Sequence, residues 1–383
     1  MISQQGDFFS YLLSIILLFL FYYLMTELQK RFLELNIKNF LEELEIYENS
    51  TKIIIYRAIL KARKDLLEKA KSLGAKIKYE REFMRIQKRI NEVLESFLID
   101  PVTLDPRGVI DRLEHLLNVR ERRLEGIADQ ILPNAPEDIK RNLENILEAA
   151  AAIHSIYKLT RHYYEASKFY NSPVILYQLQ LILPVLKGII RTYYDAQRAF
   201  SESLPIGDSV GPLVASRFFS DEVFFDEETK FSYSINNVIN RKVIAAKAMG
   251  PGGNVGHPGK FLEKIINQEK VDLVITVDAA IKFEGEETGE VAVGVGAAIG
   301  DPGPEKFRIE QLCTEKKIPL FAVIIKESIV DAVIPFSKKL SDSIERACEE
   351  ILKLIEEETK EGDTVVILGI GNSVGIGNIK VIK

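Results

Sequence analysis

The chain has 383 residues, of which 46% are hydrophobic, so it is long enough for two or three domains with substantial cores. Its net charge of −6 and its pI near 5.6 argue against a nucleic-acid partner, because proteins that bind nucleic acid carry a basic surface. The two cysteines, Cys313 and Cys348, have no second cysteine or histidine at ligand spacing, which argues against a zinc site and predicts free thiols.

The segment Phe8–Met25 is a run of 18 uncharged residues. A helix of this length spans roughly 27 Å, close to the thickness of about 30 Å of a hydrocarbon core. The leader lacks a basic region and no small-residue cleavage site follows, so we expect a single membrane-spanning helix in contact with lipid. Lys30, Arg31 and Lys38 follow the segment, which places the bulk of the chain in the cytoplasm. A buried hairpin helix is the alternative interpretation.

Residues 27–204 have helical patterning, with charged residues between Ile and Leu at three- and four-residue spacing. Within them, Ser172–Ile190 is apolar enough to suggest a second span. Four polar or helix-perturbing residues favour instead a helix buried in a bundle: Gln178, Gln180, Pro184 and Lys187. The sequence therefore predicts an anchor at 1–26, a helical domain at 27–204 that is a scaffold or a surface for a protein partner, and a third domain at 205–383.

Residues 205–383 alternate strands with amphipathic helices, which predicts an α/β domain with a largely parallel sheet between two helical layers. Its clearest strand, Leu273–Val277, is apolar on both faces and ends at Asp278. In open parallel sheets, ligands bind at the carboxyl ends of the strands. Asp278 is therefore expected to lie in a site.

Three glycine-rich segments, Gly250–Gly259, Gly294–Gly303 and Gly369–Asn378, accompany this strand. Glycine lets a backbone approach a ligand closely, so we expect these loops to form the site. A Walker-type or dinucleotide loop at Gly369–Asn378 is rejected because no helix follows it. The candidate loop residues are Gly211, Gly252, Asn254, Gly256, His257, Gly300, Asp301, Gly303, Gly371 and Asn372.

Four stretches in order resemble signatures of the superfamily of germination proteases and hydrogenase-maturation proteases. They are LPIGDSVGPLVASRF from Leu204, MGPGGNVGHPGKFLEKI from Met249, KVDLVITVDAA from Lys270, and IGDPGPEKFRIEQLCTEKKIPLFAVIIKESIVDAV from Ile299. The resemblance covers about a third of the chain. The whole architecture, anchor included, also resembles an archaeal family of membrane proteins known as a domain of unknown function.

This resemblance implies that Asp208 and Asp278 are the two catalytic or metal-binding acids of a peptidase-like hydrolase. Two neighbouring carboxylates can share a proton or hold a divalent metal, and either arrangement activates a water molecule. His257 is the one histidine in these loops and is a possible third metal ligand. The alternatives are that both aspartates only cap local backbone, and that the domain is a non-catalytic module that binds a ligand or a partner.

The sequence departs from the protease pattern at one point, because a helix rather than a strand precedes Asp208. The matching strand, DTVVILGIGN, starts at Asp363, which implies a circular permutation. Thr364–Leu368 is apolar throughout, as expected of a strand covered on both faces. We therefore predict that it lies in the centre of the sheet beside Leu273–Val277, with Asn372 hydrogen-bonded near Asp208.

Overall fold

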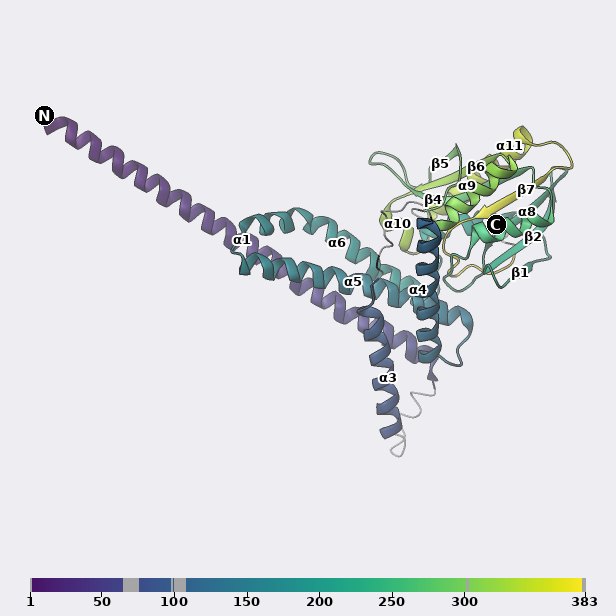
Figure 1. Cartoon of the computed structure of the whole chain (residues 1–383), viewed down its shortest axis with the longest axis horizontal. Helices are drawn as coiled ribbons and strands as arrows, with labels where there is room; N and C mark the ends of the chain where they lie inside the picture. Colours follow the sequence, from purple (N-terminus) through teal and green to yellow (C-terminus); the bar gives the residue numbers. More distant parts are fainter. Residues whose placement is uncertain (1, 65–75, 98, 100–107, 301–302, 381–383) are drawn as a thin grey trace. The chain divides into compact units, whose positions relative to one another are not determined.

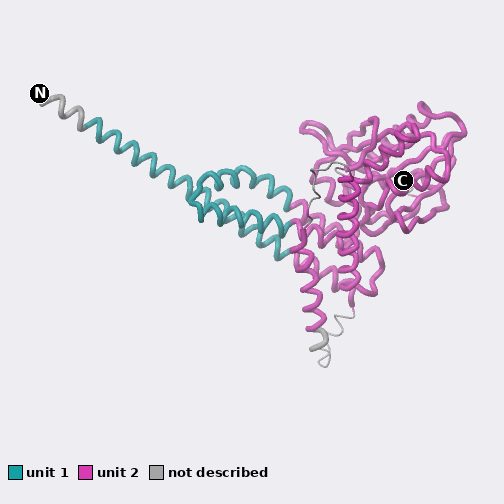
Figure 2. Tube along the Cα trace, in the orientation of Figure 1, with its two compact units in different colours: residues 1–50, 153–190 teal, residues 51–152, 191–383 magenta. Residues whose placement is uncertain are grey.

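The computed structural model describes the chain except for residues 1, 65–75, 98, 100–107, 301–302 and 381–383. The described residues form two compact units (Figure 2). Unit 1 comprises residues 1–50 and 153–190, and unit 2 comprises residues 51–152 and 191–383. The predicted division at residue 204 remains a prediction, because unit 2 combines helices that precede this residue with the sheet that follows it.

Unit 1 is built from parts of three helices, α1 (Ile2–Ala62), α5 (Glu137–Phe169) and α6 (Pro173–Glu202). One face of α1 is buried at helical spacing, with Leu33, Ile37 and Leu44 as examples. An ion pair of 2.7 Å joins Lys187 of α6 to Glu43 of α1.

Two helices of the described chain, α1 and α6, are long and apolar enough to cross a membrane. None of the most apolar window of α1 is buried, and its side chains from Tyr11 to Met25 are largely exposed. Only 22% of the corresponding window of α6 is buried. The expectation that Ser172–Ile190 is a buried helix is therefore wrong for one face, since Leu179 and Leu183 are buried but Leu181 is 80% exposed.

In unit 2, the helices include the end of α1, α3 (Lys76–Leu94), α4 (Val109–Ile131), the first half of α5 and the end of α6. Their shared core contains Ile59, Ile90 and Leu147, together with Ile206 and Val374 from the loops beside the sheet. The helical core of unit 2 thus includes side chains from the loops beside the sheet.

Within the described residues, the sheet has seven strands in the order β1-β2-β3-β7-β4-β6-β5 (Figure 1). Pairing is parallel from β3 through β7 and β4 to β6, and antiparallel at both flanks. The strands are β1 (Phe224–Asp226), β2 (Phe231–Val238), β3 (Arg241–Ala248), β4 (Leu273–Ile281), β5 (Val291–Val295), β6 (Leu320–Glu327) and β7 (Thr364–Gly369).

Helices cover both faces of this sheet, which confirms the predicted three-layer α/β fold. One face packs on α7 (Val210–Arg217) and α11 (Lys338–Glu358), and the other on α8 (Pro258–Gln268) and α9 (Pro304–Lys316). Alternate residues of the central strands enter the two cores, so these strands are apolar at nearly every position. Two short elements, η2 (Gly207–Ser209) and α10 (Ile329–Val333), complete the domain.

The last strand, β7, lies in the centre of the sheet, as its apolar sequence predicts. Val366 pairs with Ile244 of β3 on one side and with Val274 of β4 on the other. Four successive residues of β7, from Val365 to Leu368, are fully buried.

Candidate functional site: a buried carboxyl cluster

Three acidic side chains meet at the carboxyl ends of the central strands. Asp278 lies near the end of β4, Glu327 is the last residue of β6, and Asp208 lies in η2 directly before α7. Asp278 and Glu327 are buried, with exposed fractions of 5% and 2%, whereas Asp208 is partly exposed. Because parallel strands end at the same edge of a sheet, residues far apart in sequence converge there.

Two glycines allow this close assembly. A Cβ atom on Gly211 would lie 2.0 Å from the carbonyl oxygen of Ile370 and 2.4 Å from that of Val277. Gly371 has a φ of 123°, and a Cβ atom there would lie 2.0 Å from the carbonyl oxygen of Asp208. Both residues are thus required for the packing of α7 and η2 against the ends of β7 and β4, and the protein itself fills the space beside them.

Backbone amides fix the two aspartates. The amide of Asn372 donates to Asp208 Oδ2 at 2.7 Å, which confirms the expected proximity of these residues. The amide of Ala279 donates to Asp278 Oδ1 at 2.8 Å, and the amide of Gly300 donates to the same carboxyl group. The hydrogen bond from Asn372 shows that the loop after β7 holds Asp208. Asp208 does not cap α7, because no side chain forms a capping hydrogen bond at the start of this helix.

The cluster retains protons that isolated carboxyl groups lose. Burial raises the pKa of Asp208 to about 6, against the opposing effect of the Asn372 amide. Burial raises the pKa of Asp278 well above its ordinary value, and the negative charge of Asp208 raises it further. Burial also raises the pKa of Glu327 to about 9, helped by the charges of Asp208, Asp331 and Asp278.

Glu327 is the member of the cluster that sequence reasoning missed. Neither of its carboxyl oxygens has a hydrogen-bond partner within the described chain. The signal was present, because Glu327, like Asp278, is an acidic residue that follows a run of apolar strand residues. Polar neighbours hide this signal, because Lys326 and Ser328 flank Glu327 and a polar segment at a strand end predicts exposure to solvent.

The segment Gly250–Gly259 contacts protein rather than open space. A Cβ atom on Gly252 would lie 2.7 Å from the Cα of Asp138 in α5, and one on Gly256 would lie 2.6 Å from the ring of Phe231. Asn254 accepts a hydrogen bond of 2.9 Å from the amide of Ser373. These three predicted loop residues therefore join the segment to α5, to β2 and to the loop after β7.

One side chain of α5 connects this segment to the acid cluster. Asn145 donates to the carbonyl of Gly253 at 2.8 Å, and Asn372 donates to Asn145 Oδ1 at 3.4 Å. Asn372 is also the residue whose amide holds Asp208. The helical part of unit 2 is thus hydrogen-bonded to the loop that positions the first aspartate.

The structure does not bring His257 to the aspartates. His257 lies at the start of α8, with Nδ1 3.4 Å from Glu305 and Nε2 3.9 Å from Glu121. Within the described residues, no group of three histidine, cysteine or acidic side chains is arranged to hold a metal ion. Of the remaining candidates, Gly303 precedes α9, and Asp301 lies outside the described residues.

A lysine in β3 is buried near the same edge of the sheet. Lys247 is in register with Gly369 of β7 and has no exposed surface. It donates to the carbonyl of Ala248 at 3.2 Å and to Asn378 Oδ1 at 3.1 Å. Burial lowers the pKa of Lys247 to about 7, and no ion pair involves it in the described part of the chain.

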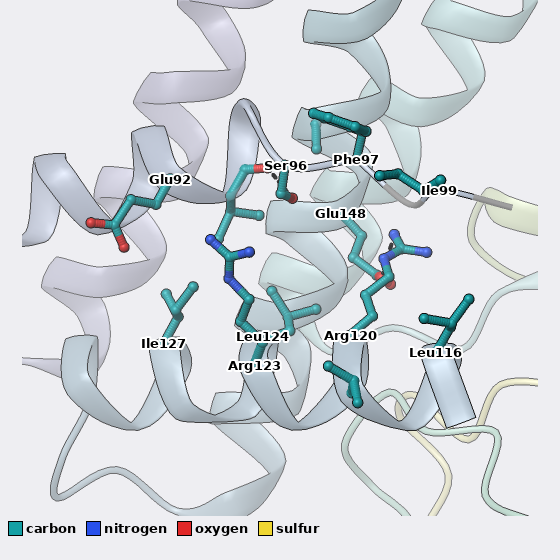
Figure 3. Close-up of a pocket in the computed structure, with 13 residues that line it drawn as sticks. Glu92, Ser96, Phe97, Ile99, Leu116, Arg120, Arg123, Leu124, Ile127 and Glu148 are labelled. Carbon is teal, nitrogen blue, oxygen red and sulfur yellow. Dashed lines mark hydrogen bonds and ion pairs between the residues drawn. The ribbon is translucent and has the colours of Figure 1, made fainter. Parts of the chain in front are cut away.

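A separate cavity of about 380 Å³ lies among α3, α4 and α5 in unit 2 (Figure 3). Its lining is mostly apolar, and the side chains of Arg120 and Arg123 enter it from α4. Arg120 forms an ion pair of 2.9 Å with Glu148 of α5. The cavity contains none of the predicted site residues, and it could not be anticipated because arginines on an amphipathic helix look like an ordinary solvated face in sequence.

Comparison with known proteins identifies the family but no characterised relative. A profile described as the DUF1512 N-terminal domain, a protein of unknown function, matches residues 11–203, and the DUF1512 C-terminal domain of unknown function matches residues 206–377. No curated protein and no solved structure matches the chain. Since the two profiles cover almost the whole sequence, the chain belongs to the DUF1512 family.

Proposed function

We propose that this chain is a hydrolase in which Asp208 and Asp278 form an acid–base pair. The observation that carries the proposal is that these two carboxyl groups meet at the carboxyl ends of the central strands, each held by backbone amides, where burial raises the pKa of both. Carboxyl groups whose environments separate their pKa values divide into a base and an acid, which is the requirement for activation of water. Ordinary structural carboxylates are instead paired with cations or exposed to solvent.

The directions of these pKa shifts support different roles for the two aspartates near neutral pH. Asp208, with a pKa of about 6, is ionised and takes a proton from water as the water oxygen attacks a carbonyl carbon. Asp278 keeps its proton and gives it to the leaving group, so the bond to that group breaks without net change in charge. Glu327 stays protonated and acts as a positioning residue, since a third buried negative charge would oppose ionisation of Asp208.

Amides are the proposed substrate class, and the support for this is the resemblance of the four motifs to peptidases. The proposed location is the cytoplasmic face of a membrane, with Phe8–Met25 as a single span. Its support is the exposed apolar window of α1 and the basic residues that follow it. No step is assigned to a metal, because no three of the described side chains are arranged as ligands of a single ion.

The test uses the full chain in detergent with a library of quenched fluorescent peptides. We expect Asp208→Asn and Asp278→Asn each to lower kcat by about 100-fold or more, the usual contribution of general acid–base catalysis. Asp221→Asn is the matched control, because Asp221 is exposed and lies outside the cluster. The native enzyme should gain activity as the pH rises through about 6, and full activity of both variants would refute the assignment.

Infrared spectroscopy tests the proton-sharing pair independently of any substrate. A protonated carboxyl band should persist at neutral pH in the native chain and weaken in Asp278→Asn and in Glu327→Gln, but not in Asp221→Asn. If all four proteins show the same carboxyl band, the cluster does not hold protons and the proposed acid is absent.

A non-catalytic binding module is the second candidate, and the cavity of Figure 3 favours it. Apolar walls together with an arginine side chain that enters the cavity suit an amphiphile that carries a carboxylate. A medium-chain fatty acid should then raise the melting temperature of the chain, and Arg123→Ala should abolish this rise. Arg122→Ala is the control, because the adjacent Arg122 does not line the cavity. An equal rise in both variants would exclude this site.

A further inference from the structure

The turn between α5 and α6 exposes aromatic and aliphatic side chains where a polar loop is normally found. Phe169 is 83% exposed and Tyr170 is 70% exposed, and Val174 in the first turn of α6 is 61% exposed. Contiguous exposed apolar groups on a tight turn mark an interaction surface, in contrast to scattered single residues. We refer to Phe169, Tyr170 and Val174 as the hairpin tip.

Hydrogen bonds place the hairpin tip at a defined height along α1, within unit 1 (Figures 1 and 2). Lys30 of α1 donates to the side chain of Asn171 in the turn. Tyr177 of α6 donates to Gln29 of α1 at 3.2 Å. Both contacts are made only four or five residues after Met25, the end of the predicted span.

This height corresponds to the headgroup region of a bilayer. A helix rises 1.5 Å per residue, so Lys30 lies about 7 Å beyond Met25. Interfacial apolar groups are buried by roughly 5–10 Å at the boundary between headgroups and acyl chains. The hairpin tip therefore reaches the interface when the preceding segment of α1 crosses the hydrocarbon core.

The composition of the tip also suits this interface. Tyrosine is enriched at the boundary between lipid and water, because its ring is apolar and its hydroxyl group stays wet, and phenylalanine is common on the lipid-facing side of interfacial segments. Exposed basic side chains accompany them, since the side chain of Arg31 is 75% exposed and that of Lys168 is 46% exposed. Aromatic and basic side chains directly after the proposed span therefore fit a lipid surface at this height.

We infer that the hairpin tip is a second membrane contact, inserted into the headgroup region of the same bilayer leaflet that α1 leaves. The inference rests on the proposed membrane span and deepens it, because the tip would fix the orientation of unit 1 on the membrane. The bilayer, and not a second copy of the chain, is the proposed occupant.

The chain has no tryptophan, so a single introduced tryptophan reports its own surroundings. Four full-length variants are reconstituted in vesicles of phosphatidylcholine and phosphatidylglycerol: Phe19→Trp, Phe169→Trp, Ile46→Trp and Leu181→Trp. The vesicles contain lipids that carry a spin-label quencher either near the headgroup or in the middle of the acyl chain. All four native side chains are more than half exposed, so the substitutions are matched in local packing.

We expect Phe169→Trp to lose about half of its emission with the quencher near the headgroup, and less with the quencher in mid-chain, as for an interfacial residue. Phe19→Trp should show the opposite order. Ile46→Trp, 21 residues after Met25 and thus about 30 Å further along α1, should lose little emission with either lipid.

Each other outcome has a distinct meaning. If Phe19→Trp is quenched from mid-chain but Phe169→Trp is not quenched at all, the tip inference fails and the span survives. If Phe19→Trp is not quenched, the proposed span fails first. Strong quenching of Leu181→Trp from mid-chain would show that α6 itself crosses the bilayer, and a blue-shifted but unquenched Phe169→Trp would show that protein covers the tip. Both results overturn the inference.

Discussion

Replacing Glu327 by glutamine should stabilise the protein, and the gain should grow with pH. The pKa of Glu327 is raised from 4.5 to about 9 in the folded chain, so the fold retains a proton that the unfolded chain releases. Below about pH 4.5 both states are protonated and the effect vanishes. As the pH rises toward 9, the unfolded state is increasingly favoured. Glutamine has the shape of the protonated acid but cannot ionise.

The magnitude follows from proton linkage. Each pH unit between the two pKa values changes the free energy of unfolding by about 1.4 kcal/mol. At pH 7 the native chain is therefore about 3 kcal/mol less stable than it would be with a residue that stays neutral. No reduction for solvent screening is needed, because Glu327 is only 2% exposed.

Urea unfolding of the full chain in detergent, followed by circular dichroism, measures this difference. We expect the native and Glu327→Gln proteins to have similar midpoints near pH 4.5 and clearly separated midpoints at about pH 7 and 8. Glu356→Gln is the control, since Glu356 is exposed on α11 and lies outside the cluster. The reasoning is refuted if Glu327→Gln is destabilising at every pH, or if its effect does not depend on pH.

Three further predictions follow from packing and burial. Gly211→Ala should lower the free energy of unfolding by about 3 kcal/mol or more, because its Cβ would overlap two backbone carbonyls, whereas Gly126→Ala, with open space around it, should be neutral or slightly stabilising in urea unfolding. Lys247→Met should raise the melting temperature most below pH 7, because the native lysine is then buried with its charge. The gain should shrink as the pH approaches 10, where the lysine of the unfolded chain also loses its proton. A gain that increases with pH would contradict the lowered pKa of Lys247. A chain ending at Gly362 should lose protease resistance throughout the sheet, whereas one ending at Asn378 should keep it, because the second chain retains β7 and the hydrogen bonds between Asn378 and Gly250.

Strand identity could be predicted from the sequence because the central strands are covered on both faces. Leu273–Val277 and Thr364–Leu368 are apolar at nearly every position, and the structure places them side by side. The same patterns indicate Asp278 as a charge at a strand end. Such strands can be recognised from a short segment of sequence, because the apolar pattern depends only on burial of the strand itself.

The role of each glycine could not be predicted, because ligand binding and close packing require the same residue. Gly211 and Gly371 are needed for contact with Ile370 and Asp208, and Gly252 is needed for contact with α5. Likewise, Glu327 joins the cluster through the order of strands in the sheet. That order depends on pairing between segments far apart in sequence, which no local pattern encodes.

The sequence of α6 also does not show which face of the helix is exposed. Leu181 and Leu183 are chemically equivalent and only two residues apart, yet one is 80% exposed and the other is 5% exposed. Helical periodicity predicts that they face different directions. It does not indicate which of the two directions is occupied by another helix.

The central position of β7 has a consequence for how the sheet is made. β7 is the seventh strand in chain order, yet it separates β3 from β4. Until β7 has been synthesised, these two strands each present an open edge of unpaired amides and carbonyls, which is a template for aggregation. In the nascent chain, β3 and β4 therefore belong to two separate parts of the sheet until β7 is available to pair with both. The open edges of β3 and β4 are the surfaces that a chaperone would have to cover in that interval.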